Sequence, residues 1–162
     1  MDKIWAPWRS HDRLVTGYKK WDCLFCGVSK SEEDEKNLLL ERGKLCFCMM
    51  NLFPYNNGHI MIAPLRHTSK FEELTKEELL EIGQMTQRWI KLLTELYSPD
   101  GFNIGMNLGV AAGAGVAGHL HRHIVPRWSG DANFMTVIGS TDVISVSLET
   151  SYKKLKEISM QL

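Results

Sequence analysis

The sequence has no excess charge, no long apolar run and no internal repeat, and each absence argues against a class of protein. Its 19 basic and 19 acidic residues cancel over 162 residues, which argues against long-range attraction to nucleic acid or an anionic membrane but leaves room for a local cationic pocket. No segment approaches about 20 apolar residues, and residues 1–10 contain no signal-peptide core. We therefore expect a cytoplasmic protein with neither nucleic acid nor membrane as a partner.

Cysteine is also scarce, with four residues in the chain. In a reducing cytoplasm we expect thiols, so Cys23 and Cys26, a C-x-x-C pair, are not predicted to form a structural disulfide. A thioredoxin-like role needs a strand–helix context that is missing around this pair. One C-x-x-C is half of a tetrahedral zinc site, but such a pair also arises by chance or through burial. Cys46 and Cys48 alternate on a predicted strand and are expected in the core.

Hydrophobic periodicity predicts an α+β domain built on an antiparallel sheet, since strands are joined by short links around one long helix. Asn57-Gly58 is a hairpin signal between the first two strands, and Thr75 with Glu78 matches a capping box. The charged stretch 29–37 is expected to be a solvated loop or a frayed helix end. The predicted strands are 44–52, 59–65, 102–109 and 119–126, and the predicted helices are 76–97 and roughly 149–160. The apolar stripe of the long helix is expected to be Leu79, Ile82, Trp89, Leu93 and Leu96.

Three histidines, His119, His121 and His123, occupy alternate positions in one predicted strand. Side chains at such spacing share a face, so Arg122 and its apolar neighbours point the other way. A half-exposed polar face, a zinc site on the triad and nucleophilic catalysis by a neutral imidazole all remain open explanations.

The surroundings of the triad favour phosphoryl chemistry. The preceding run GVAAGAGVAG places backbone N–H groups where an anion can approach them closely. Arg127 follows the triad and can neutralise a phosphate. Asn51 and Asn107, on neighbouring strands, offer amides to hydroxyls or phosphate oxygens.

The segment HLHRHIVPR resembles the H-φ-H-φ-H-φ-φ signature of the histidine triad (HIT) superfamily of nucleotide hydrolases and transferases. NLFPYNNGHIMIAPLRH is similar to the family's N-x-x-P-x-x-x-G-H-x-x-x-x-P-x-R segment, and the resemblance runs from Trp5 to roughly Gly139. WAPWR and CLFC look like the start of its bacterial members. The segments closest to a bacterial branch assigned as diadenosine tetraphosphate phosphorylases are NLFPYNNGH, GFNIGMNLG and PRWSGDANFM. The resemblance implies one domain with about five strands: an N-terminal arm over 1–40, a core over 41–139 and a C-terminal helix and tail over 140–162.

The resemblance also implies a mechanism on a nucleotide substrate such as a dinucleoside polyphosphate. His121 is the implied nucleophile, which attacks the α-phosphorus and forms a nucleotidyl-histidine, and inorganic phosphate or water then releases the nucleotide. His123 and His59 match positions that hydrogen-bond the phosphate and orient the nucleophile. Asn51 matches a residue near the ribose, and Asn107 matches an amide that contacts the phosphate or the leaving group.

Two positions depart from the family pattern. Arg122 stands where the family has an apolar residue, but it is expected on the face away from the triad. Gly115 stands where relatives often carry Ser, Thr or Gln against the leaving group, so backbone N–H groups of the loop are expected to substitute.

A structural zinc ion is implied by the same resemblance. Relatives that keep the C-x-x-C pair complete the site with the histidine after P-x-R and the first triad histidine. These positions are His67 and His119 here, with Cys23 and Cys26 as the other ligands, which leaves His121 free to react.

Relatives are mostly homodimers, and Met85, Trp89 and Leu92 widen the apolar surface of the long helix beyond one stripe, so we expect a homodimer. The alternative is that these side chains complete the core of a single chain. Two other functions stay open: a non-catalytic nucleotide-binding sensor and a zinc hydrolase that uses all three triad histidines as ligands.

Overall fold

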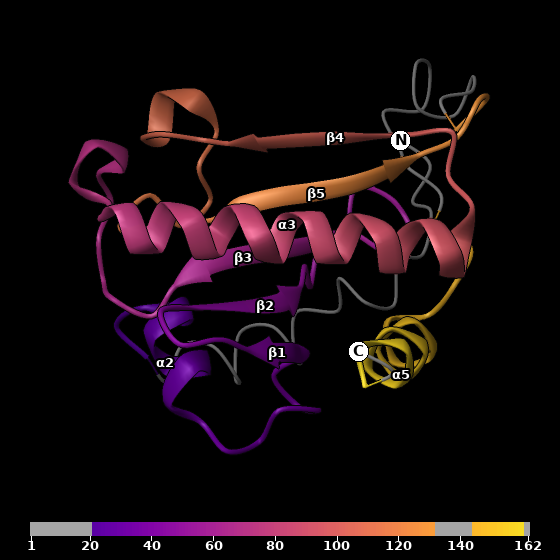
Figure 1. The fold of residues 1–162 in the computed structure, drawn as a ribbon, viewed down its shortest axis with the longest axis horizontal. Coiled ribbons are helices and arrows are strands. Elements are labelled where there is room, and N and C mark those ends of the chain that lie inside the picture. The colour runs from indigo at the N-terminus through magenta and orange to yellow at the C-terminus, as the bar shows by residue number, and fades with distance from the viewer. Residues whose placement is uncertain (1–20, 132–143, 161–162) are drawn as a thin grey trace, which may run out of the picture.

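The computed structural model of the protein describes residues 21–131 and 144–160. These residues form a five-stranded antiparallel sheet in the order β1-β2-β3-β5-β4, with helices packed on it (Figure 1). The predicted α+β class is confirmed. The strands are β1 (Leu39–Arg42), β2 (Cys46–Met50), β3 (Ile60–Pro64), β4 (Gly101–Met106) and β5 (Arg122–Arg127). The helices are α2 (Leu24–Lys30), α3 (Lys76–Tyr97) and α5 (Leu148–Ser159), with short 3-10 turns η2 (Phe71–Glu73) and η3 (Val110–Ala112).

The sheet lies between two separate apolar clusters. One cluster fills the space between the sheet and helices α3 and α5, with Trp89 and Ile124 fully buried in it. The other lies on the opposite face of the sheet, where Phe25 and Val28 of α2 pack against Phe47. Figure 1 shows α3 lying over one face of the sheet, roughly along the direction of the strands, with α5 beside β1. Burial on both faces explains why β2 and β3 are apolar throughout.

Helix α3 begins where the sequence predicts. The Thr75 side chain accepts from the Glu78 backbone N–H at 3.2 Å, and the Glu78 carboxylate accepts from the Thr75 N–H at 2.9 Å. This reciprocal pair is the capping box, which satisfies two N–H groups that the first helical turn leaves unpaired. The capping box therefore fixes the residue at which the long helix begins.

The buried face of α3 differs from the predicted stripe. Leu79 is 39% exposed, so its assignment to the core is wrong, and Leu96 is only partly buried. Met85, Trp89 and Leu92 are almost fully buried within one chain. The indole N–H of Trp89 also donates to the Glu41 carboxylate at 2.8 Å. The alternative weighed above therefore holds: these side chains complete the monomer core, and they give no support to a dimer.

The connection between β2 and β3 is longer than a two-residue hairpin. It occupies residues 51–59, and Gly58 adopts a positive φ of 74° near its end. A Cβ at Gly58 would lie 2.9 Å from the Tyr97 ring, so glycine is required by both conformation and space. This connection delivers Asn51, Tyr55 and His59 to one end of the sheet.

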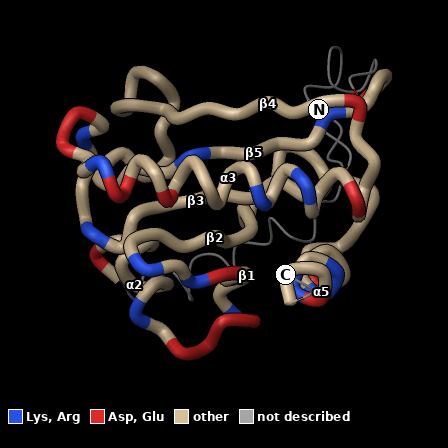
Figure 2. Tube along the Cα trace, in the orientation of Figure 1, with Lys and Arg blue, Asp and Glu red and all other residues tan. Residues whose placement is uncertain are grey.

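Figure 2 shows where the charged residues fall along the backbone. Helix α3 carries both acidic and basic residues, and the segment between α2 and β1 contains the acidic run 32–35 followed by Lys36, whereas β3 and β4 contain no charged residue. No helix within 21–131 and 144–160 is long and apolar enough to cross a bilayer. The WAPWR segment and residues 132–139 of the family resemblance lie outside the described residues.

Candidate functional site

The three triad histidines follow one another along a single face of the sheet. His123 lies in β5, whereas His119 and His121 immediately precede that strand. The His121 and His123 rings lie 4.9 Å apart, and Phe25 contacts both His119 and His121. On the other face, Leu120 and Ile124 enter the core under α3. Arg122 also points there and donates to Thr86 Oγ1 at 3.3 Å, as the alternation predicts.

The hydrogen bond of His121 sets which of its nitrogens is free. Its Nδ1 lies 2.9 Å from the carbonyl oxygen of His119, and a carbonyl only accepts, so Nδ1 carries the proton. The Nε2 atom of the neutral ring then keeps its lone pair. Burial lowers the pKa of His121 below its usual value, while the bond to the carbonyl opposes that shift. At neutral pH the ring is therefore an uncharged imidazole with Nε2 available as a nucleophile.

A second histidine pair is ordered by a chain of hydrogen bonds. The backbone N–H of Tyr55 donates to His59 Nδ1 at 3.0 Å, so the proton of His59 is on Nε2. That Nε2–H donates to His123 Nδ1 at 2.9 Å. His123 must then carry its own proton on Nε2, which is buried and has no partner in the described residues. A buried N–H without an acceptor is a candidate contact for a substrate oxygen.

Both members of this pair are held neutral. Burial, with a smaller contribution from neighbouring histidines, lowers the pKa of His59 to about 3 and that of His123 to about 4. The Tyr55 ring covers the pair, with its centroid 4.6 Å from that of His59 and 5.9 Å from that of His123. His123 is thus a neutral donor rather than a cation under ordinary conditions.

His121 and His123 open onto a cavity of about 380 Å³, a volume typical of small-molecule sites. One part of its wall is apolar and is formed by Phe25, Met61 and Val116, among others. The rest includes side-chain amides and the glycine-rich loop. An apolar compartment beside a few aligned polar groups suits a flat ring attached to a charged group.

Three of the four residues predicted to bind substrate line this cavity: Asn51, Asn107 and Gly115. The Asn51 amide nitrogen lies 3.4 Å from both ring nitrogens of His59, and its oxygen accepts from the Phe53 N–H. The Asn107 amide donates to the Gly113 carbonyl at 3.5 Å across the loop.

Arg127 does not line the cavity. It lies at the far end of β5, where its guanidinium donates twice to Asp131 at 2.7 Å and once to Asn103 at 2.8 Å. This pairing lowers the pKa of the Asp131 carboxyl to about 2. The predicted phosphate contact of Arg127 therefore has no geometric support, because strand β5 carries the side chain away from the histidines.

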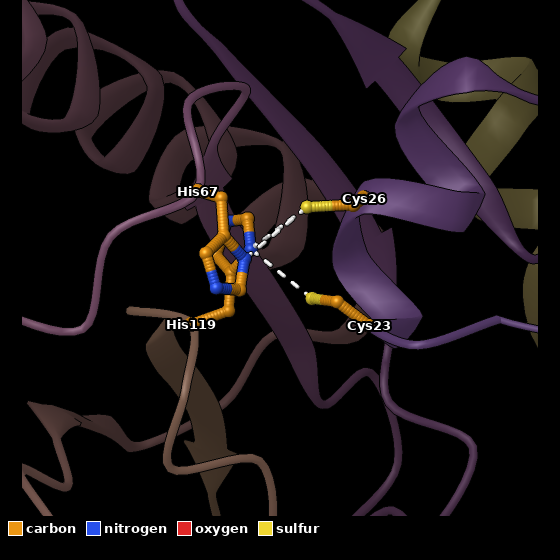
Figure 3. A group of neighbouring side chains, drawn as sticks. All are labelled: Cys23, Cys26, His67 and His119. Carbon is orange, nitrogen blue, oxygen red and sulfur yellow. Dashed lines mark hydrogen bonds between the residues drawn. The ribbon is translucent and has the colours of Figure 1, made fainter.

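A second cluster lies directly beside the triad. The ligand atoms of Cys23, Cys26, His67 and His119 all lie within 4.8 Å of one another, so these four residues could hold a metal ion (Figure 3). The closest pairs are Cys26 Sγ with His67 Nδ1, 3.3 Å apart, and Cys23 Sγ with His119 Nδ1, 3.4 Å apart. Figure 3 shows both rings turned toward the two sulfur atoms.

The tautomer of His119 fits a metal ligand. Its Nε2 lies 2.8 Å from the Pro64 carbonyl, which places the proton on Nε2 and leaves the Nδ1 lone pair facing the cysteines. Two thiolates and two neutral imidazoles form a closed tetrahedral donor set of the kind that structural metal sites use. The four residues named from the sequence are therefore brought together by α2, the segment after β3 and the segment before β5.

Two aromatic side chains at the site were not identified as functional from the sequence. Phe25 lies inside the CLFC segment and Tyr55 inside NLFPYNNGH, but aromatic residues flanked by apolar or turn residues read as core or loop. Their contact with histidines far away in the chain depends on the tertiary fold. The one sequence signal that could have identified these two residues as part of the site is their position inside the two segments that resemble the family.

Comparisons with known proteins identify the family of the chain. The HIT domain family model matches residues 31–130. Over 122 residues, 75% of the chain, the sequence is 47% identical to an AP-4-A phosphorylase of Mycobacterium tuberculosis. It is 32% identical over 134 residues to an uncharacterized HIT-like protein of Methanocaldococcus jannaschii, covering 83% of this chain and 98% of that one. The match spans 63% of the mycobacterial phosphorylase, which is less than two thirds of its length.

A solved structure shows the same fold. A Zn-bound histidine triad family protein from Mycobacterium smegmatis superposes with a TM-score of 0.70 at 24% identity, covering 86% of this chain and 94% of that one. The resemblance seen in the sequence is thus confirmed by an independent family model and by sequence identity to the diadenosine tetraphosphate branch. The chain belongs to the HIT domain family.

Proposed function

We propose that this protein is a nucleotidyl-transferring enzyme that acts on dinucleoside polyphosphates, or related nucleoside phosphates, through a covalent nucleotidyl-His121 intermediate. The observation that carries the proposal is the complementary pair of tautomers: His121 has a free Nε2 lone pair, and His123 has a buried Nε2–H without a partner. A nucleophile and a donor thus lie side by side on one cavity wall. The identity to the M. tuberculosis AP-4-A phosphorylase supports this substrate class.

The residues then take distinct roles. His121 Nε2 attacks the α-phosphorus, and the phosphorus–oxygen bond to the leaving polyphosphate breaks. His123 donates to a phosphate oxygen, and His59 fixes the tautomer of His123. Asn51 and Asn107 position the nucleotide at the cavity wall. The amides of Gly113 and Ala114 already donate to carbonyls of the loop, and those of His119 and Leu120 also donate to carbonyls. The amides of residues 115–118 are therefore the ones left to contact the leaving group.

We also propose that the four-residue cluster holds one structural Zn²⁺. Its Cys₂His₂ donor set and the His119 tautomer support this choice, since thiolate and imidazole ligands favour zinc. When bound, zinc would crosslink the start of α2 to the segment after β3 and to the segment before β5. It leaves the chemistry to His121, His123 and His59.

The covalent step is tested by mass spectrometry after brief mixing with diadenosine tetraphosphate. The wild-type protein should gain one adenylyl group, because that group joins His121 Nε2. The His121→Ala variant should gain none and lose turnover, while it still binds the nucleotide through the remaining cavity wall. Substantial turnover by this variant would rule out His121 as the nucleophile.

Two measurements then refine the assignment. The His123→Ala variant serves as the matched comparison and should retain adduct formation at a rate about 10²–10⁴-fold lower, since it loses one donor but no nucleophile. Products formed with and without inorganic phosphate identify the acceptor: ADP plus ATP indicates phosphorolysis, and AMP plus ATP indicates hydrolysis. A nucleotide-binding sensor would bind the compound and yield neither adduct nor products.

A further inference from the structure

The face of the His121 ring is covered by Phe25, a residue from a distant part of the chain. Their ring centroids lie 4.8 Å apart with an interplanar angle of 27°, a stacked arrangement. Phe25 is 1% exposed and comes from α2, whereas His121 is 5% exposed and precedes β5. Stacking on the face leaves the edge of the His121 ring, which carries Nε2, uncovered by Phe25, and both residues line the cavity.

Nucleophilic attack makes this contact electrostatically important. In the proposed reaction the Nε2 lone pair forms a bond to phosphorus while Nδ1 keeps the proton that it donates to the His119 carbonyl. The P–O bond breaks, and its electron pair leaves with the polyphosphate. A ring substituted at both nitrogens is an imidazolium, so one positive charge appears on a side chain that was neutral in the free enzyme.

The protein offers this new charge little other stabilisation. Among the described residues, no carboxylate pairs with the His121 ring, and its hydrogen-bond partner is the neutral carbonyl of His119. The neighbouring His123 contributes no negative charge. The anionic oxygen of the attached phosphoryl group is then the charge nearest to the imidazolium, and the described residues add none of their own. In this buried site a favourable contact on the ring face therefore matters more than it would in water.

We propose that Phe25 stabilises the cationic nucleotidyl-His121 intermediate, and the transition state leading to it, through the π face of its ring. This inference rests on the proposed function, because the charge arises only if His121 is the nucleophile. The quadrupole of a phenyl ring places negative potential on its face and attracts a cation there. A neutral imidazole gains far less from the same contact, so the stabilisation grows as the bond to phosphorus forms, which is the condition for raising the rate. In the second step the acceptor attacks phosphorus, the N–P bond breaks, and its electron pair returns to Nε2.

Packing alone would also place a phenyl ring here. Phe25 belongs to the apolar cluster beneath α2 and lies 6.3 Å from Phe47 in a tilted arrangement. The two roles differ in one respect: packing depends on the shape of the ring, whereas stabilisation of a cation depends on its π electrons. Fluorination changes the electrons and nearly preserves the shape, so it separates them.

The experiment replaces Phe25 with a series of phenylalanines carrying one, two and three ring fluorines. Single-turnover formation of the adenylyl adduct is measured at saturating diadenosine tetraphosphate, which removes effects on binding. We expect the rate to fall stepwise with each fluorine, with a total loss on the order of tenfold. The same series at Phe47, which is buried in the same cluster but packs on Phe25 rather than on His121, is the matched control and should leave the rate unchanged. Thermal unfolding and metal content should remain those of the wild type in both series.

The outcomes are distinguishable. Equal adduct rates across the Phe25 series overturn the inference and leave the nucleophile in place. A parallel decline in the Phe47 series also overturns it, because the effect would then reflect packing of the cluster. Failure of the wild-type protein to form any adduct removes the proposed nucleophile, and the inference with it. The Phe25→Leu variant, which retains an apolar side chain without π electrons, should show a loss at least as large as the most fluorinated ring.

Discussion

Replacing His59 with glutamine tests the neutral histidine pair through the pH dependence of stability. His59 is fully buried, and burial lowers its pKa in the folded protein to about 3, against an ordinary histidine value of 6.5. Between these values the unfolded chain binds a proton that the folded protein excludes, so stability falls as the pH decreases through this window. Each pH unit below 6.5 costs about 1.4 kcal/mol for one such group, which gives about 2 kcal/mol at pH 5 relative to pH 8. The His59→Gln variant should lose this component.

The assay is urea unfolding of both proteins at about pH 8 and about pH 5. The free energy of unfolding of the wild type should decrease more over this range than that of the variant, by about 2 kcal/mol. Contributions from carboxylates and from the metal-site histidines are common to both proteins and cancel in the comparison. The variant will be less stable at either pH, but the test concerns the difference between the two pH values. Equal pH dependence in the two proteins would mean that His59 is not held neutral. The tautomer of His123 was assigned from the hydrogen bond that neutral His59 donates, so that assignment would then fail.

Three further predictions follow from the same geometry. Untagged protein should contain about one zinc ion per chain by elemental analysis. The paired Cys23→Ser, Cys26→Ser variant should lose both the zinc and thermal stability. Zinc retained by that variant would show that other residues bind the metal. The Arg127→Gln variant should keep kcat/KM within about threefold of the wild-type value, since this guanidinium binds Asp131 away from the cavity; a loss above about 30-fold would restore the predicted phosphate contact. Sedimentation equilibrium at micromolar concentration should report twice the 18.5 kDa chain mass if the family-based expectation of a homodimer holds, and a monomer would contradict it.

Sequence patterns predicted the fold where local chemistry and burial act together. The capping box at Thr75 identifies the start of α3, because the residues that satisfy the first N–H groups are adjacent in sequence. The sequence also predicted that Arg122 points away from the triad histidines, because successive side chains in a strand point to opposite faces. Strand β2 and strand β3 appear as apolar runs bounded by turn residues.

The elements missed by the sequence reading are short. Strand β1 has four residues and ends in Glu41 and Arg42, so its apolar part is too brief to form a period. Helix α2 has seven residues, and its N-cap, Cys23, makes no side-chain capping bond. Neither element carries a local signal strong enough to predict it. Both are held by tertiary contacts: β1 pairs with β2, and α2 packs its Phe25 and Val28 onto the sheet.

The error at Leu79 has a related cause. A helical period identifies a face but not its width or its exact orientation on the sheet. Met85 and Leu92 were assigned to an additional surface, whereas the sheet and α5 together cover a broader sector of α3 than a single sheet face would. A helix that contacts two elements needs a wider apolar face. The additional apolar residues Met85 and Leu92 are therefore no evidence for contact with a second chain.

The same contacts weigh against a metal bound by all three triad histidines. A shared ion would require three lone pairs to converge on one point, but each ring has a different bond that fixes its tautomer. His119 directs Nδ1 toward the cysteines, His121 uses Nδ1 to donate to a carbonyl, and His123 uses Nδ1 to accept from His59. Of the described residues, the cluster able to hold a metal includes only His119 from the triad. Alternation therefore puts the rings on one face, while the backbone and side-chain partners of each ring give the three histidines separate chemical states.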